Sequence, residues 1–202
     1  MSLPFFAQSR LGDAWFSVGL TSSFPNIAES GSVTLHEPQL CGQGASTPGC
    51  KVFHVPSTDS THAHQIEADA VLSQNGTALQ DQVLVFQYRG KFHAVDNKRC
   101  PHSAFPLAKG IPFDIEDFGV VLSAGLTCPK HGWSFDLFTG QSDRSNYMLR
   151  RWEVQLRPVI KPEIPANDDG TNGKTDQDQE VWYDLWGIER CCPHCTHHVH
   201  LK

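Results

Sequence analysis

The chain has 202 residues, of which 39% are hydrophobic and 10% aromatic, with a formal net charge of −6. This composition predicts a globular domain with a sizeable core, and the acidic balance without a basic stripe argues against nucleic-acid binding. No apolar run reaches the length of a transmembrane helix, and residues 1–10 lack the pattern of a signal or transit peptide. We therefore expect a cytoplasmic protein without a membrane partner, and a length that leaves no room for a second, catalytic domain.

The first part of the chain predicts one short strand followed by loops. The strand is expected at Trp15–Gly19. Residues 22–80 contain a turn-rich stretch and a polar stretch without period, and they predict an insertion of loops with a short strand near 51–55. Cys41 and Cys50 flank the turn-rich stretch. In a reducing cytosol both are expected to be thiols, and a disulfide between them is the alternative for an exported protein.

From residue 83 onward the chain predicts a succession of short strands. Residues 83–88 are apolar and β-branched, and an Arg-Gly turn separates them from 91–95, so the two form a hairpin. His93 alternates with apolar neighbours and is expected to be structural, and 113–118 is expected to be an extra loop. Further strands are expected at 119–126, 134–137, 148–156 and 180–185. Many short strands with turns between them predict an all-β fold.

Two short stretches each place one cysteine and one histidine close together. The first hook is Cys100-Pro101-His102, and the second hook is Cys128-Pro129-Lys130-His131. Two thiolates and two imidazoles suit a [2Fe–2S] cluster in which the cysteines hold one iron and the histidines hold the other. Prolines stiffen such loops and glycines let them turn tightly. The candidate ligands of a metal centre are therefore Cys100, His102, Cys128 and His131.

A structural zinc site is the alternative for these four residues, because two cysteines and two histidines also form a tetrahedral zinc sphere. The sequences next to the hooks weigh against zinc. Ser-Ala-Phe-Pro-Leu follows the first hook, and Gly-Trp-Ser-Phe-Asp follows the second. Neither flank has a role in zinc binding.

With these flanks the hooks resemble the Rieske [2Fe–2S] family, in particular soluble Rieske-type ferredoxins and oxygenase-type Rieske domains. The resemblance covers roughly 15–20, 82–158 and 180–186. It implies a Rieske-type antiparallel β-sandwich base with a small inserted cluster-binding subdomain at about 94–141. It also implies one [2Fe–2S] cluster per chain, with the cysteines on the inner iron and the histidines on the outer iron, nearer solvent and a redox partner.

The hooks differ from those of the respiratory branch of the family. Respiratory members carry an additional cysteine in each loop, joined as a disulfide, and hydroxyl side chains two and four positions after the second histidine. This chain has no further loop cysteine, and Trp133 and Phe135 stand at the two positions. Fewer hydrogen bonds to sulfur imply a potential toward the low end of the Rieske range, roughly −150 mV rather than about +300 mV.

The resemblance implies an electron carrier that is not itself an enzyme, working between a reductase and an oxygenase or another acceptor. An oxygenase subunit would add a mononuclear iron held by two histidines and a carboxylate. After His131 the only histidines fall in the last nine residues, with no carboxylate among them. Two alternatives stay open: a separate Rieske subunit of a multi-component oxygenase, and a zinc-stabilised interaction module.

The domain organisation expected from the sequence is a single Rieske domain over 1–190 and a Cys/His-rich tail at 191–202. Seven acidic residues and one lysine fall between residues 163 and 184, and 163–180 predicts a flexible acidic loop. Basic residues instead gather around the hooks: Lys98, Arg99, Lys109 and Lys130. A basic face there is expected to meet an acidic surface on a redox partner.

Overall fold

The computed structural model describes residues 15–27, 33–41, 45–56, 62–67, 81–97, 105–159 and 178–184. In this part of the chain the regular structure is strands and two short 3-10 helices, so the expected all-β class is confirmed. No helix among these residues has the length and hydropathy to cross a membrane. Cys100, His102, residues 163–177 and the tail at 191–202 lie outside the described residues.

The strands were largely expected from the sequence, and their observed bounds follow. They are β1 Trp15–Leu20, β2 Asn26–Ile27, β3 Pro38–Cys41, β4 Ala45–Pro48, β5 Cys50–His54, β6 His64–Ile66, β7 Gln82–Tyr88, β8 Lys91–Asp96, β9 Ile111–Asp117, β10 Val120–Cys128, β11 Trp133–Asp136, β12 Arg151–Trp152, β13 Val154–Pro158 and β14 Gln179–Asp184. The 3-10 helices are η1 Thr21–Ser23 and η3 Leu107–Lys109.

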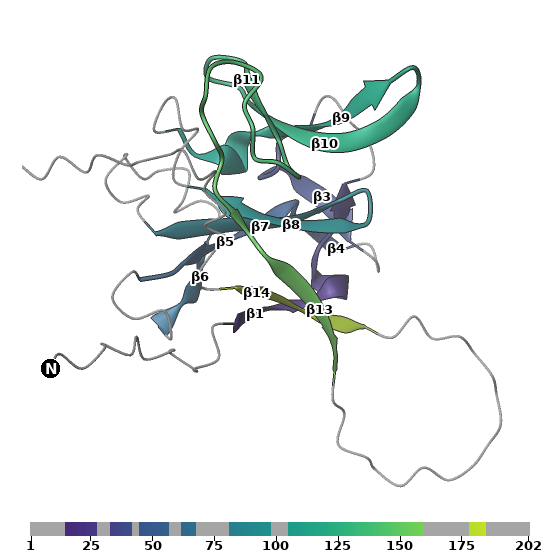
Figure 1. Cartoon of the computed structure of the whole chain (residues 1–202). Helices are drawn as coiled ribbons and strands as arrows, with labels where there is room; N and C mark the ends of the chain where they lie inside the picture. The colour runs from purple at the N-terminus through teal and green to yellow at the C-terminus, as the bar shows by residue number, and fades with distance from the viewer. Residues whose placement is uncertain are drawn as a thin grey trace, which may run out of the picture.

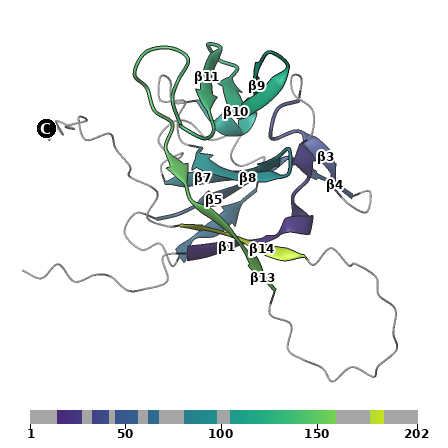
Figure 2. The same ribbon diagram turned by 45° about the vertical axis from the view of Figure 1, so that its right-hand side comes forward.

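Three of the sheets are stacked as layers, with β7 in the middle one, and the two-stranded β3–β4 sheet lies beside them (Figures 1 and 2). The middle sheet has the order β12-β8-β7-β5-β6, and β2 joins β7 in parallel. Because successive side chains of a strand point to opposite faces, Leu84 and Phe86 pack toward the β9–β10–β11 sheet while Val83 and Val85 pack toward the β1–β14–β13 sheet. Both faces of β7 are therefore buried, which explains its unbroken apolar run.

The stretch 22–80 contains the short strand expected near 51–55, which is β5, and also β2, β3, β4 and β6, which were not expected. β5 pairs with β7 over its whole length, from Cys50 opposite Phe86 to His54 opposite Gln82. This segment thus supplies a strand of the middle sheet. Cys50 is buried, with its pKa raised by burial to about 12, and Cys41 lies on β3; the two thiols are not bonded to each other.

Two expectations for the second half of the chain are wrong. Residues 113–118 are not a loop: they form most of β9 and the first residue of its turn into β10. The alternation of apolar and polar residues in β9 is that of a strand with one covered face. The single strand expected at 148–156 is instead divided at Glu153, where β12 leaves β8 and β13 joins β14.

His93 is a buried side chain of the middle sheet, in agreement with its expected structural role. Its ring lies against Phe86, with centroids 5.5 Å apart, and against Phe138 at 5.6 Å. Burial, and then the charge of Lys91, lower the pKa of His93 to about 4, and Asp136 opposes this shift in part. The folded protein therefore holds a neutral imidazole where the unfolded chain would be protonated below pH 6.5.

This shift predicts that folding stability falls as the pH drops from 6.5 toward 4. In that window the unfolded chain binds a proton at His93 and the folded chain does not, so one histidine contributes a slope of about 1.4 kcal/mol per pH unit. His93→Phe removes the titrating group and keeps an aromatic ring. Between pH 7 and pH 5 the variant is expected to gain about 2 kcal/mol relative to the unmodified protein in urea unfolding. Parallel pH profiles for the two proteins would contradict this.

Candidate metal centre

The second hook is the turn of the β10–β11 hairpin. Cys128 is the last residue of β10 and pairs with Trp133, the first residue of β11. The backbone N–H of Gly132 donates to the carbonyl of Cys128 at 3.0 Å and closes the turn. Gly132 has a φ of +68°, a conformation that glycine adopts without the Cβ clash of other residues. The sequence between the two ligands is therefore held in one tight turn.

The two candidate ligands of this hook, Cys128 and His131, differ in burial. Cys128 is 0% exposed and packs with Leu126 and Phe135 in the core, whereas His131 is exposed. A buried thiol beside an exposed imidazole fits a two-iron cluster whose thiolate side faces the protein and whose imidazole side faces solvent. The donor set and its orientation are thus compatible with the cofactor implied by the resemblance.

Asn97, whose side chain is fully buried, links the chain before the first hook to the chain after it. Its amide Nδ2 donates to Gln82 Oε1 at 2.9 Å, and its Oδ1 accepts from the backbone N–H of Ala108 at 2.8 Å. The backbone N–H of Leu107 also donates to the carbonyl of Asn97 at 3.3 Å. Asn97 therefore holds residue 97, which precedes the first hook, next to residues 107 and 108, which follow it.

The structure also brings residues 105–109, which follow the first hook in the sequence, against the second hook. Leu107 and Ala108 share a core cluster with Cys128, and Phe105 packs on the same cluster. The Nζ of Lys130, within the second hook, lies 5.9 Å from the centre of the Phe105 ring, and Lys109 Nζ lies 5.8 Å from it. The chain on the C-terminal side of Cys100 and His102 thus contacts the turn that carries Cys128 and His131.

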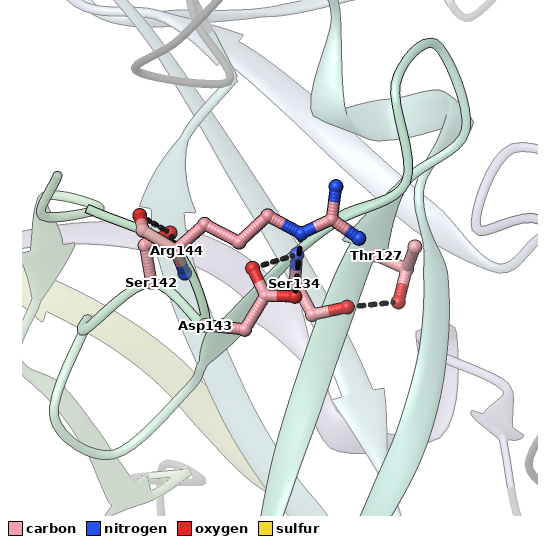
Figure 3. Close-up of polar contacts among 5 residues, drawn as sticks. All are labelled: Thr127, Ser134, Ser142, Asp143 and Arg144. Carbon is pink, nitrogen blue, oxygen red and sulfur yellow. Dashed lines mark hydrogen bonds and ion pairs between the residues drawn. The ribbon is translucent and has the colours of Figure 1, made fainter.

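A polar network holds the hairpin that carries the second hook (Figure 3). The backbone N–H of Ser134 donates to Asp143 Oδ1 at 3.0 Å, and the N–H of Asp143 donates back to the Ser134 carbonyl at 2.9 Å. Ser142 Oγ donates to the Arg144 carbonyl at 2.6 Å and keeps the following loop compact. Because a carboxylate makes strong hydrogen bonds to N–H groups, Asp143 fixes β11 next to the ligands.

The side chains that follow His131 are aromatic or bonded elsewhere. Phe135 is 0% exposed, and the Trp133 ring packs edge-on against Tyr147 with centroids 5.2 Å apart. The Ser134 hydroxyl shares a hydrogen bond of 2.9 Å with Thr127. Neither Trp133 nor Phe135 can donate a hydroxyl hydrogen bond to sulfur.

Within the described ranges no three His, Cys, Asp or Glu side chains gather as a metal site. The second hook supplies two of the four expected ligands, and Cys100 and His102 lie outside these ranges. Asn97 and Asp143 were not singled out from the sequence. A polar residue directly after an apolar strand and before the first hook was the available signal for Asn97, and no comparable signal existed for Asp143.

Comparisons with known proteins agree with the motif. Residues 58–152 match the family described as the Rieske [2Fe-2S] domain. A search of curated proteins finds no match. Among solved structures, the chain is similar to a putative NADH-dependent nitrite reductase small subunit from Mycobacterium tuberculosis. The two are 13% identical, the match covers 83% of this chain and 93% of the other, and the TM-score is 0.39, a likeness too weak to carry an argument about function.

Proposed function

Because residues 58–152 of this chain belong to the Rieske [2Fe–2S] family and mark it as an electron carrier, we propose that it passes single electrons at low potential between a reductase and an oxygenase or another acceptor. The domain implies a [2Fe–2S] cluster, which supplies one-electron chemistry when bound. In this proposal Cys100 and Cys128 hold the inner iron, and His102 and His131 hold the outer one. In this proposal the chain carries electrons and does not itself convert a substrate.

The observation that supports this proposal best is the second hook itself. One tight turn presents a buried thiol and an exposed imidazole, and its Lys130 lies beside Phe105, three residues after His102 in the sequence. An exposed imidazole places the redox-active end within reach of another protein. We also propose the cytoplasm as its location, supported by the unbonded thiols of Cys41 and Cys50.

The experiment that tests this function is EPR spectroscopy of the purified protein after reduction, together with metal and sulfide analysis. A Rieske-type signal is expected, with iron and acid-labile sulfide in equal amounts. Zinc without sulfide would instead select a zinc-stabilised interaction module.

We further propose that the partner docks through an acidic surface at the cluster end. Lys109 and Lys130 each place their Nζ within 6 Å of the centre of the Phe105 ring, and Lys130 is adjacent in sequence to His131. Among the described residues, neither lysine forms an ion pair with a carboxylate. Their charges are therefore available to attract an acidic surface and raise the association rate.

Small inorganic oxidants provide a direct measurement of this charge. Lys109→Gln with Lys130→Gln is expected to slow oxidation of the reduced protein by ferricyanide roughly 3- to 10-fold at low ionic strength, and to speed oxidation by hexaammineruthenium(III). The control is Arg157→Glu, which changes the net charge by the same amount on β13, far from the β10–β11 turn (Figure 1). Stopped-flow rates that change equally in the double lysine variant and in Arg157→Glu, or in neither, would contradict the proposal of a basic face at the cluster end.

A further inference from the structure

The β9–β10 hairpin extends beyond the sheet that carries the second hook. β11 pairs only with Gly125–Cys128, whereas β9 continues along β10 as far as Val120. We call residues 115–123 the arm; Figures 1 and 2 show it projecting past β11. The base of the arm is fixed by Asp114, which pairs with Arg89 and accepts a hydrogen bond from Tyr88 Oη at 2.9 Å.

The tip of the arm is apolar and open to solvent. Phe118 is 99% exposed, and three consecutive residues of β10 are also exposed: Val120, Val121 and Leu122. Single exposed apolar side chains are ordinary, but a contiguous group of this kind marks an interaction site in a stable protein. No packing within the described part of the chain accounts for Phe118.

The backbone of the tip makes Phe118 harder to explain as a structural residue. Phe118 has a φ of +47° and Gly119 a φ of +78°, the two-residue turn in which asparagine followed by glycine is favoured. A bulky residue at positive φ is strained, and such strain persists where another requirement outweighs it. The phenyl ring thus contributes neither core packing nor a favourable turn, which indicates a role outside the monomer.

Charges on the arm restrict what it contacts. Glu116 and Asp117 are exposed opposite Val121 and Val120, and no described cation pairs with either carboxylate. Acidic flanks disfavour an anionic lipid surface and disfavour tip-to-tip contact between two copies. The register shift between Val121 and Ser123 interrupts the open edge of β10, which disfavours addition of another strand.

We propose that the arm docks a protein partner whose surface has an apolar pocket bordered by lysine or arginine, with Phe118 as the anchor. A buried aromatic anchor inside a charged rim is the usual distribution of binding energy at interfaces. Eight residues of β10, 120–127, separate the turn at the tip from Cys128, and the distance from Val120 to Cys128 is about 26 Å along a strand. The arm therefore binds a partner away from the metal centre, and this inference does not depend on the proposed electron transfer.

The test places a photo-reactive benzoylphenylalanine at position 118 of the full-length protein in its own cells. The control carries the same residue at Leu40, another exposed apolar side chain, on β3. We expect a protein crosslinked from position 118 and not from 40. Once purified, that protein is expected to bind the intact holoprotein at least tenfold more tightly than it binds Phe118→Asn or the double variant Glu116→Lys with Asp117→Lys.

Phe118→Asn separates loss of binding from loss of folding, because asparagine suits this turn. Its melting temperature is therefore expected to equal or exceed that of the parent protein. No crosslink above the Leu40 level, or equal affinities of parent and variant, would overturn the proposal. If sedimentation velocity shows a concentration-dependent dimer, and Phe118→Asn abolishes it, the arm binds a second copy of this chain and the proposal is overturned. Binding to phosphatidylserine vesicles that requires Phe118 would show that the arm binds a membrane instead of a protein, and would also overturn the proposal.

Discussion

Replacing His131 with alanine is expected to abolish the Rieske-type EPR signal of the reduced protein. The variant removes one of the two imidazoles proposed to hold the outer iron, and an incomplete ligand set does not retain this cluster type. His131 is exposed on a turn, so the loss is expected without unfolding of the strands that carry it. Absorbance, EPR and far-UV circular dichroism of the purified variant separate loss of the cluster from loss of the fold.

The matched control for that variant is Lys130→Ala, one residue away in the same turn. Lys130 is exposed, and its Nζ lies 5.9 Å from the centre of the Phe105 ring. It is expected to keep iron, sulfide and the EPR signal. An unchanged signal in His131→Ala would remove His131 from the proposed ligand set, and loss of the signal in both variants would point to the turn conformation rather than to the imidazole.

The second large effect concerns the reduction potential. A midpoint near the low end of the Rieske range, roughly −150 mV, is expected because hydrogen bonds to sulfur raise the potential and two positions that donate them in respiratory members are Trp133 and Phe135 here. Phe135→Tyr adds a hydroxyl to a buried ring in the same core cluster as Cys128. It is expected to raise the midpoint on the order of tens of mV in an optical redox titration.

Ser134→Ala is the control for this titration. The Ser134 hydroxyl already shares a hydrogen bond with Thr127, so its removal is expected to leave the midpoint unchanged. A clearly positive midpoint in the unmodified protein would contradict the proposed low potential. An unchanged midpoint in Phe135→Tyr, with the cluster intact, would show that this position does not direct a donor to sulfur.

Local patterns predicted the strands that deliver the chain to the hooks. The β7–β8 hairpin was expected because an apolar, β-branched run, a turn and a second run follow each other directly in the sequence. β9 was missed because its apolar side chains alternate with acids, which resembled a polar loop. In the structure the Phe113 ring covers Gly125 so closely that a Cβ there would lie 2.2 Å from it. The pairing of β9 with β10 thus depends on Gly125, twelve positions after Phe113, so the local pattern of β9 did not reveal it.

By itself the sequence determined the candidate ligand set: two Cys/His hooks with their flanks predict the Rieske cofactor, because ligand type and spacing are local properties. Only the tertiary structure decided that Cys128 is buried while His131 is exposed, and that an apolar arm ends in a strained, exposed Phe118. It also decided that Asn97 bonds to Ala108 beyond the first hook and that Asp143 bonds to Ser134 beyond the second. Burial and hydrogen bonding between distant segments depend on which strands meet, and this is specified by the packing of the whole chain rather than by any single stretch of it.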